Sequence, residues 1–332
     1  MSYHRNKLFL SVVALIALFL ICYHHTINSS LPDWVNSSSL CQPALSTNDS
    51  AFRFGHSRSK ACPKDTDILI LVKSSVIESR RILRDSLKRS WAKLVLLQRD
   101  VEENPVKIQI RFLTGKFETG IYDDPMIIEG TFEDTFESVL FKALMGFRWA
   151  EKNCQASLVI LTDDDSVLLP WNLITFYLQL RQNRKFNERP FYGGGFQFKN
   201  NPVSRIKHVY DLPPEIMPCL TYPDYIAGSL IMLNSVLMKQ WNQLGTPFSH
   251  KMYFEDVLFG YLSKKLNLQA NYSEHTSHPN CDWNFRLFMD TSKILLCHGA
   301  DEAVRSDKLF RNACDSIRNS QTLKEDYKIY CT

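Results

Sequence analysis

Apolar runs alternate with amphipathic segments along the chain from residue 67 onward. The runs DILILVKSS (67–75), KIQIRFLTG (107–115) and SLVILT (157–162) have the length and the aliphatic content of buried strands. Helical patterns lie between them, one through Trp91 and a clearer one across residues 132–153. This alternation predicts an α/β fold with a mostly parallel central sheet that is flanked by helices.

The rest of the chain continues the same pattern. Residues 171–181 and 255–266 are expected to be helical, and a strand is expected near residues 225–233. The glycine run at 193–195 would allow strands to pack closely. We therefore assign one folded domain to residues 67–332.

An uncharged apolar run, LFLSVVALIALFLICY, occupies Leu8–Tyr23. We interpret it as a transmembrane signal anchor rather than a cleaved signal peptide, because no small-residue cleavage site follows it. Arg5 and Lys7 precede the run, which predicts a type II orientation with residues 1–7 in the cytoplasm. Residues 24–66 are polar and rich in Ser and Asn, and we interpret them as a luminal stem.

Three further features favour a luminal location for the domain. The anchor has only 16 residues, which suits the thinner membranes of the early secretory pathway, and we expect the Golgi membrane. Besides Cys22, eight cysteines remain, an even number that suits an oxidising compartment, although their pairing cannot be deduced. Asn-x-Ser glycosylation motifs occur at Asn28, Asn36, Asn48 and Asn271.

The charge composition argues against nucleic acid as a binding partner. Lysine and arginine together number 39 against 35 acidic residues, which gives a net charge of +4. Because no basic stripe accompanies this small excess, nucleic acid is not expected as a partner. The apolar fraction of 45% is that of a globular protein with a sizeable core.

Three carboxylates, Asp163, Asp164 and Asp165, directly follow the predicted strand at 157–162. In open α/β sheets, ligands bind at the carboxyl edge of the strands. Adjacent carboxylates repel one another unless a cation compensates, and their hard oxygens suit Mn²⁺ or Mg²⁺, which in turn binds a diphosphate. The alternative is a solvated acidic turn or a helix cap before Pro170, and the position after a buried strand favours the metal site.

Several segments of the chain occur in a recognisable order. They are LILVKSS with the following Arg84–Trp91, then FEDTFESVLFKAL, RWAEKNC, the Asp triplet, YPDYIAG, FEDVLFG and LLCHG. Over residues 67–312 these segments resemble the inverting β-1,3-glycosyltransferases, a family of galactosyl- and N-acetylglucosaminyltransferases with a GT-A-type fold. The chain departs from the family pattern at Lys88, Ser138–Leu140, Leu161, Leu169 and Ser229. The donor sugar is therefore left open between galactose, which we slightly prefer, and an N-acetylhexosamine.

The resemblance implies a role for each member of the acidic triplet. Asp163 and Asp164 are implied to contact the UDP-sugar donor. Asp163 and Asp165 are implied to bind Mn²⁺ or Mg²⁺. Of the two, Asp165 is preferred as the residue that ligates the metal directly. His298 in LLCHG matches a metal-side histidine of the family, and its alternative is a histidine whose hydrogen bonds are satisfied at a strand end.

The resemblance also implies the catalytic residues. In FEDVLFG, Asp256 matches the family's catalytic base, and Glu255 is implied to support the acceptor or the loop. The alternative for both is the favourable placement of acidic residues in the first turn of a helix.

Four more residues are implied to contact the substrates. Ser74 and Arg84 match positions that approach the nucleotide, although Arg84 would also suit a structural ion pair. Tyr222 and Tyr225 are implied to line the cleft for donor and acceptor.

The implied reaction is a single in-line displacement. Asp256 accepts a proton from a hydroxyl group of a glycan acceptor on a glycoprotein or glycolipid, UDP departs, and the anomeric configuration inverts. One alternative is a catalytically silent Golgi protein that binds glycans or escorts another enzyme, which the intact acidic residues disfavour. A second is a luminal metal-dependent hydrolase, which would require more His and carboxylate ligands.

Overall fold

The structure is a computed structural model. It describes residues 59–93, 106–118, 123–205, 210–244, 252, 254–272, 277–278, 295–299, 308 and 310–311. The predicted anchor at 8–23 lies outside these residues. Within the described ranges, none of the helices combines the length and the apolar character needed to span a membrane.

The chain divides into two compact units, and the described residues of the first are 203–205 and 210–220. Among them, the Arg205 guanidinium donates a hydrogen bond of 2.9 Å to the backbone oxygen of Cys219. It also donates to the backbone oxygens of Leu212 and Met217. All helices and strands named below belong to the second unit.

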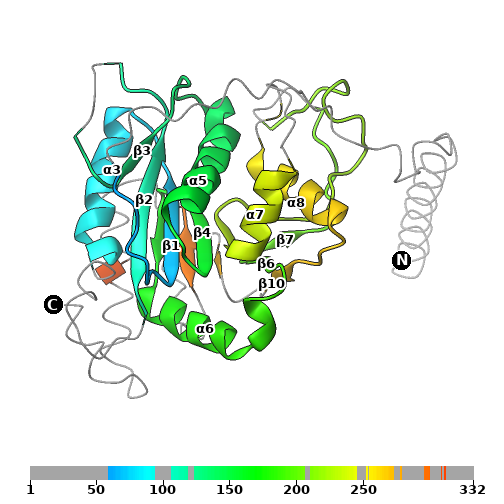
Figure 1. The fold of residues 1–332 in the computed structure, drawn as a ribbon. Helices are drawn as coiled ribbons and strands as arrows, with labels where there is room; N and C mark the ends of the chain where they lie inside the picture. The colour runs from blue at the N-terminus through cyan, green and yellow to red at the C-terminus, as the bar shows by residue number, and fades with distance from the viewer. Residues whose placement is uncertain are drawn as a thin grey trace, which may run out of the picture. The chain divides into compact units, whose positions relative to one another are not determined.

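The main sheet of the second unit has seven strands in the order β10-β6-β9-β4-β1-β2-β3 (Figure 1). The strand β9 is antiparallel to both of its neighbours, whereas the other pairs are parallel. This arrangement confirms the predicted mostly parallel sheet. The bounds are β1 (Ile68–Lys73), β2 (Ile108–Thr114), β3 (Ile127–Glu129), β4 (Leu158–Asp163), β6 (Tyr192–Gly194), β9 (Leu230–Asn234) and β10 (Asn271–Tyr272).

Two smaller sheets and a set of helices accompany the main sheet. One small sheet has the order β11-β12-β5, and the other pairs β7 with β8. Their strands are β5 (Ser166–Leu168), β7 (Gln197–Phe198), β8 (Tyr225–Ile226), β11 (Ser277–His278) and β12 (Leu296–His298). The helices are α3 (Glu78–Arg89), α5 (Val139–Asn153), α6 (Pro170–Gln182), α7 (Ser235–Gln243), α8 (Glu255–Lys265) and the 3-10 turns η3 (Phe136–Ser138) and η4 (Arg184–Phe186).

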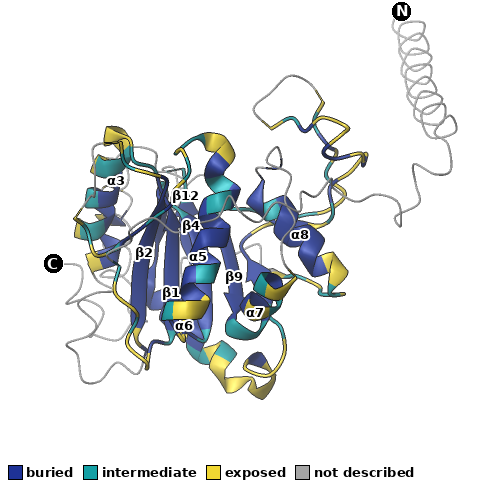
Figure 2. Ribbon diagram, turned by 45° about the horizontal axis from the view of Figure 1, so that its top comes forward, coloured by how far each residue is buried: buried dark blue, intermediate teal, exposed yellow. Residues whose placement is uncertain are grey.

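The core lies around β1 and β4, whose apolar residues have no exposed surface (Figure 2). Continuous aliphatic runs of this kind are typical of strands that are buried on both faces. Helix α5 approaches the sheet at Gly146, where a Cβ atom would lie 2.7 Å from a methyl group of Leu113. Gly193 and Gly194 also allow close packing, since a Cβ on Gly193 would lie 2.7 Å from the backbone oxygen of Asn271.

Most predicted elements are confirmed, with two local differences. The helix predicted from residue 132 begins with η3 at Phe136, because the preceding Asp134 carboxylate accepts hydrogen bonds from the backbone of Val76 and Gly115. The strand predicted near 225–233 is divided into β8 and β9. The break contains Gly228, which contacts the candidate site described below.

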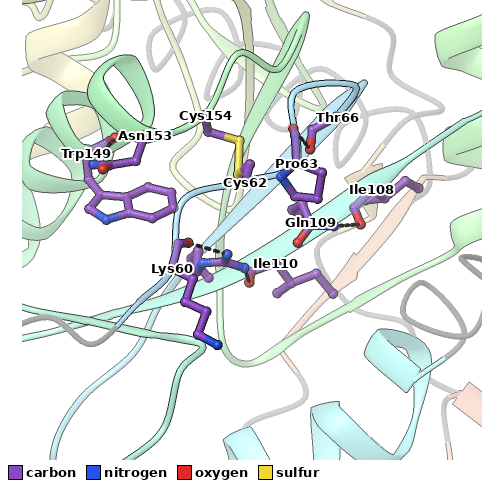
Figure 3. The surroundings of a disulfide bond; sticks show 11 residues. Lys60, Cys62, Pro63, Thr66, Ile108, Gln109, Ile110, Trp149, Asn153 and Cys154 are labelled. Atoms are coloured by element: carbon purple, nitrogen blue, oxygen red, sulfur yellow. Dashed lines mark hydrogen bonds between the residues drawn. A yellow bond between two sulfur atoms is a disulfide. The ribbon is translucent and has the colours of Figure 1, made fainter.

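A disulfide joins Cys62 to Cys154 and ties the residues before β1 to the end of α5 (Figure 3). The backbone N–H of Cys62 also donates to the oxygen of Asn153 at 2.8 Å. The guanidinium of Arg111 lies over the Trp149 ring and donates to the oxygen of Lys60. Cys219 and Cys297 are disulfide-bonded as well, so every cysteine in the described ranges is oxidised.

Candidate functional site

The candidate site is built around Lys73, which ends the central strand β1. Parallel pairing of β1 with β4 places Lys73 beside Asp163, and their side chains form an ion pair at 2.9 Å. The Lys73 ammonium also pairs with Glu255 at the start of α8 and donates to the backbone oxygen of Gly228 at 3.1 Å. Burial opposes its charge, but the Asp163 and Glu255 carboxylates raise the pKa of Lys73 above its ordinary value.

Gly228 makes this close approach possible. A Cβ atom at this position would lie 2.7 Å from a carboxylate oxygen of Glu255 and 3.2 Å from the ammonium nitrogen of Lys73. Any side chain here would therefore push apart the ion pair that fixes the start of α8. The close packing of the site at the break between β8 and β9 therefore requires a residue without a side chain.

Asp256 follows Glu255 in the first turn of α8 and is partly buried. Its carboxylate accepts a hydrogen bond of 2.7 Å from the backbone N–H of Val257. Burial and the negative charge of Glu255 raise the pKa of Asp256 to about 7, against the opposing effects of Lys73 and of backbone hydrogen bonds from Val257 and Gly228. A carboxylate with a pKa near neutrality is well matched to accept a proton from a hydroxyl group.

The three carboxylates of the triplet do not point the same way. Asp164 is buried, accepts a hydrogen bond of 2.6 Å from Ser74 and forms an ion pair of 2.7 Å with Arg80. Burial raises the pKa of Asp164 to about 6, although Arg80 and Ser74 act in the opposite direction. These contacts attach Asp164 to Ser74, in the loop after β1, and to Arg80 of α3. Its implied contact with the donor stays a prediction.

Asp163 and Asp165 point instead toward His298. The imidazole Nε2 atom of His298 lies 3.2 Å from an oxygen of Asp165 and 3.6 Å from an oxygen of Asp163. Antiparallel pairing of β12 with β5 explains the meeting, because it places His298 opposite Ser166, the residue after Asp165. The hydrogen bond with Asp165 raises the pKa of His298 above its ordinary value, against the effect of burial.

The same three residues fit a divalent cation. One candidate ligand atom from each of Asp163, Asp165 and His298 lies within 4.8 Å of the others. The Oδ1 atom of Asp165 is buried and faces the His298 imidazole at 3.2 Å. Two carboxylates and an imidazole are ligands that Mn²⁺ accepts. The structure therefore brings together the three residues that the sequence nominated as metal ligands.

Ser74 and Arg84 contact each other next to the site, and Ser74 also contacts Asp164. Arg84 is 1% exposed, donates to the Ser74 hydroxyl at 2.9 Å and also donates to the backbone oxygen of Ser75. Both contacts are with the loop after β1, so Arg84 has a structural role here, although its partners are a hydroxyl and a backbone oxygen rather than an ion-pair partner. Whether Ser74 or Arg84 also contacts the nucleotide stays a prediction.

Sequence reasoning did not nominate four charged residues that organise the site: Lys73, Arg80, Asp134 and Lys142. The Lys142 ammonium lies 2.5 Å from the Asp134 carboxylate and donates to the backbone oxygen of Ser74 at 2.6 Å. A usable signal was present for Lys73, which ends an otherwise apolar strand next to Ser74. A similar indication was present for Lys142, which is a cation among the apolar residues of the long helix.

Tyr222 and Tyr225 are both buried and meet edge to face, with ring centroids 6.1 Å apart. The Tyr225 hydroxyl accepts a hydrogen bond of 2.9 Å from Asn201, and its ring stacks on Phe198. Burial and the negative charge of Asp256 raise the pKa of Tyr225. The two tyrosines therefore lie in the surroundings of Asp256, and their contact with substrate stays a prediction.

The family profile and the relatives that match this chain are all described as glycosyltransferases. The profile of a protein family described as Galactosyltransferase matches residues 83–274, a segment that includes the acidic triplet and Asp256. The lactosylceramide 1,3-N-acetyl-beta-D-glucosaminyltransferase B of Xenopus laevis is 24% identical over 332 residues, which cover 93% of this chain and 82% of that protein. The human lactosylceramide 1,3-N-acetyl-beta-D-glucosaminyltransferase is 23% identical over 324 residues, which cover 93% and 81%. A solved glycosyltransferase involved in glycosylation of the major capsid of PBCV-1 aligns with a TM-score of 0.40 and 10% identity, over 74% of this chain and 98% of that one.

Proposed function

Because this chain belongs to the galactosyltransferase family, we propose that it transfers a sugar from a UDP-sugar donor to a hydroxyl group of a glycan acceptor with inversion at the anomeric carbon. The observation that supports the chemistry is the carboxyl group of Asp256, whose pKa is raised to about 7. It lies next in sequence to Glu255, which Lys73 connects to Asp163 of the candidate metal site. The proposed base and the proposed metal ligands are thus parts of one connected site.

The names of the relatives favour particular substrates. Both relatives are named as enzymes that transfer N-acetylglucosamine to lactosylceramide through a 1,3 linkage. We therefore choose UDP-N-acetylglucosamine as the donor, a β-galactose-terminated glycolipid or glycoprotein as the acceptor and a β-1,3 linkage as the product. UDP-galactose, which the sequence slightly favoured, is the second donor to test.

Each residue of the site has a separate role in the proposed transfer reaction. Asp256 accepts the proton of the attacking hydroxyl, which typically contributes 10²–10⁴-fold to the rate of such a reaction. Lys73 pairs with both Glu255 and Asp163 and donates to the backbone oxygen of Gly228. Asp163, Asp165 and His298 would hold Mn²⁺ or Mg²⁺, which would supply positive charge to offset the negative charge of the departing UDP.

The metal role of the triplet has a direct test. Replacing Asp165 with Ala is expected to weaken Mn²⁺-dependent UDP binding at least about tenfold, because even residues that only support metal ligands are worth that much. Isothermal titration calorimetry with and without EDTA measures the effect, and EDTA should weaken UDP binding in the wild type but not in the variant. Unchanged UDP affinity in Asp165→Ala would mean that the acidic turn is only structural.

A type II location in the Golgi membrane is part of the same proposal. Disulfide bonds at all described cysteines and an exposed Asn271 in β10 support a luminal domain. The full-length chain made in cells is expected to stay with the membrane fraction after carbonate extraction and to lose apparent mass on treatment with peptide-N-glycosidase. A soluble, unglycosylated product that begins after Tyr23 would contradict this topology.

A further inference from the structure

A half-exposed aromatic ring ends a series of three aromatic rings in contact beside the site. The Phe196 side chain is 47% exposed, and its ring meets the Phe198 ring edge to face at 4.8 Å between centroids. The Phe198 ring stacks on the Tyr225 ring at 5.0 Å with an interplanar angle of 25°. We call Phe196, Phe198 and Tyr225 the aromatic ladder. Its outer ring is held by its neighbours while one side of it remains open to solvent.

The aromatic ladder is fixed relative to α8, the helix that carries Asp256. Cross-strand pairing places Phe198 of β7 opposite Tyr225 of β8. Helix α8 packs directly on β8, since a Cβ atom on Gly260 would lie 2.6 Å from the Cβ atom of Tyr225. The raised pKa of Tyr225, caused by burial and by the charge of Asp256, agrees with this proximity.

The backbone also connects Phe196 to Asp256. The oxygen of Phe196 accepts a hydrogen bond of 2.9 Å from the N–H of Ala227, and the next residue, Gly228, has a backbone hydrogen bond to the Asp256 carboxyl. These two hydrogen bonds and the peptide unit between them keep the Phe196 backbone oxygen within about 10 Å of the Asp256 carboxyl. A disaccharide is about as long, so a glycan with one sugar at Asp256 can reach residue 196.

We propose that the aromatic ladder binds the second sugar of the glycan acceptor, the one linked to the sugar whose hydroxyl group attacks. The proposal rests on the proposed function, because it places the attacking hydroxyl at Asp256. The C–H groups on one face of a pyranose ring pack against an aromatic ring, and binding sites commonly combine such apolar contacts with a few polar groups. Phe196 supplies an exposed apolar surface on a residue whose backbone lies within this reach of Asp256.

The test compares two acceptors with UDP-N-acetylglucosamine as donor, methyl β-galactoside with one sugar and methyl β-lactoside with two. Phe196→Ala is expected to raise the KM for the lactoside about tenfold, the value of one aromatic contact, and to leave the KM for the galactoside unchanged. Phe196→Trp should keep the wild-type preference for the lactoside. UDP affinity should be equal in all variants. Leu244→Ala, which truncates another exposed apolar side chain at the end of α7, is the matched control.

The outcomes separate the two proposals. Equal effects of Phe196→Ala on both acceptors, or no effect on either, would overturn the role of the aromatic ladder while leaving the transferase activity established. A change of oligomeric state in Phe196→Ala by size-exclusion chromatography, with acceptor kinetics unchanged, would mean that the ring contacts another protein surface. If the wild type transfers sugar to neither acceptor from either donor, the proposed function fails, and the acceptor site fails with it.

Discussion

Replacing Asp256 with Asn is expected to lower the turnover number by at least about 10²-fold, because the substitution keeps the size of the side chain and removes the proposed base. UDP affinity should change little, since the proposed metal ligands are Asp163, Asp165 and His298. Steady-state kinetics and calorimetry on the same preparation measure the two quantities. Glu255→Gln, which keeps Asp256 itself, should reduce turnover less.

The raised pKa of Asp256 leads to two further tests of its assignment as the base, one on turnover and one on stability. A pKa of about 7 means that the wild-type turnover number should rise with pH through neutrality, as the base loses its proton. A carboxyl whose pKa is raised from 3.8 binds its proton more tightly in the folded state, so its charged form destabilises the fold most above pH 7. At pH 8, Asp256→Asn should therefore melt at the wild-type temperature or above it.

This stability measurement distinguishes the base from a residue that merely favours the start of its helix. If Asp256 acted only on the helix terminus, its loss would cost roughly 0.3–1 kcal/mol of unfolding free energy and leave turnover near normal. Asp65→Asn, a change at an exposed carboxylate that pairs with Lys107, is the control and should alter neither quantity. A fully active Asp256→Asn enzyme would refute the assignment.

Replacing Lys73 with Met is expected to lower the free energy of unfolding by about 3–5 kcal/mol, the usual cost of leaving a buried charge without its partner. The Lys73 side chain is 5% exposed, and its removal leaves Glu255, whose side chain is 7% exposed, without this cation. Methionine fills much of the same volume, so the loss reports the charge rather than a cavity. Denaturant unfolding followed by circular dichroism measures it.

Two comparisons make the result on Lys73 specific. Lys107→Met breaks an ion pair whose side chains are 56% and 58% exposed, and it should cost at most about 1 kcal/mol. Adding Glu255→Gln to Lys73→Met removes one of the stranded charges and should recover part of the lost stability. An unfolding midpoint of Lys73→Met equal to that of Lys107→Met would show that the buried pairs contribute no more to stability than the exposed pair.

The long apolar strands and the acidic turn could be predicted from the sequence because their signals are local. Strands β1, β2 and β4 lie in the sheet centre and are buried on both faces, which requires continuous aliphatic runs. The acidic triplet follows β4 directly, so its place at the strand end could be predicted from that strand alone. The family resemblance then added His298, whose distance from the triplet in sequence gives no local signal.

The remaining features depend on contacts between distant parts of the chain. Strand β9 reads as an ordinary buried strand, and its antiparallel direction is set by the connections around it rather than by its own residues. The two- and three-residue strands β6, β7 and β10 are too short for a periodic pattern to emerge. The role of Lys73 required the positions of both Asp163 and Glu255, which only the folded sheet brings together.

The position of the Cys62–Cys154 disulfide decides where mechanical load would enter the domain. A pull applied to the chain from its N-terminal side reaches Cys62 before it reaches β1, and the covalent bond passes the force to Cys154 at the end of α5. Hydrogen bonds open under tensions that a covalent bond withstands. Tension on a tether at the N-terminal side would therefore not run along the chain between Cys62 and Cys154, which includes β1, and would enter the sheet through β4 instead.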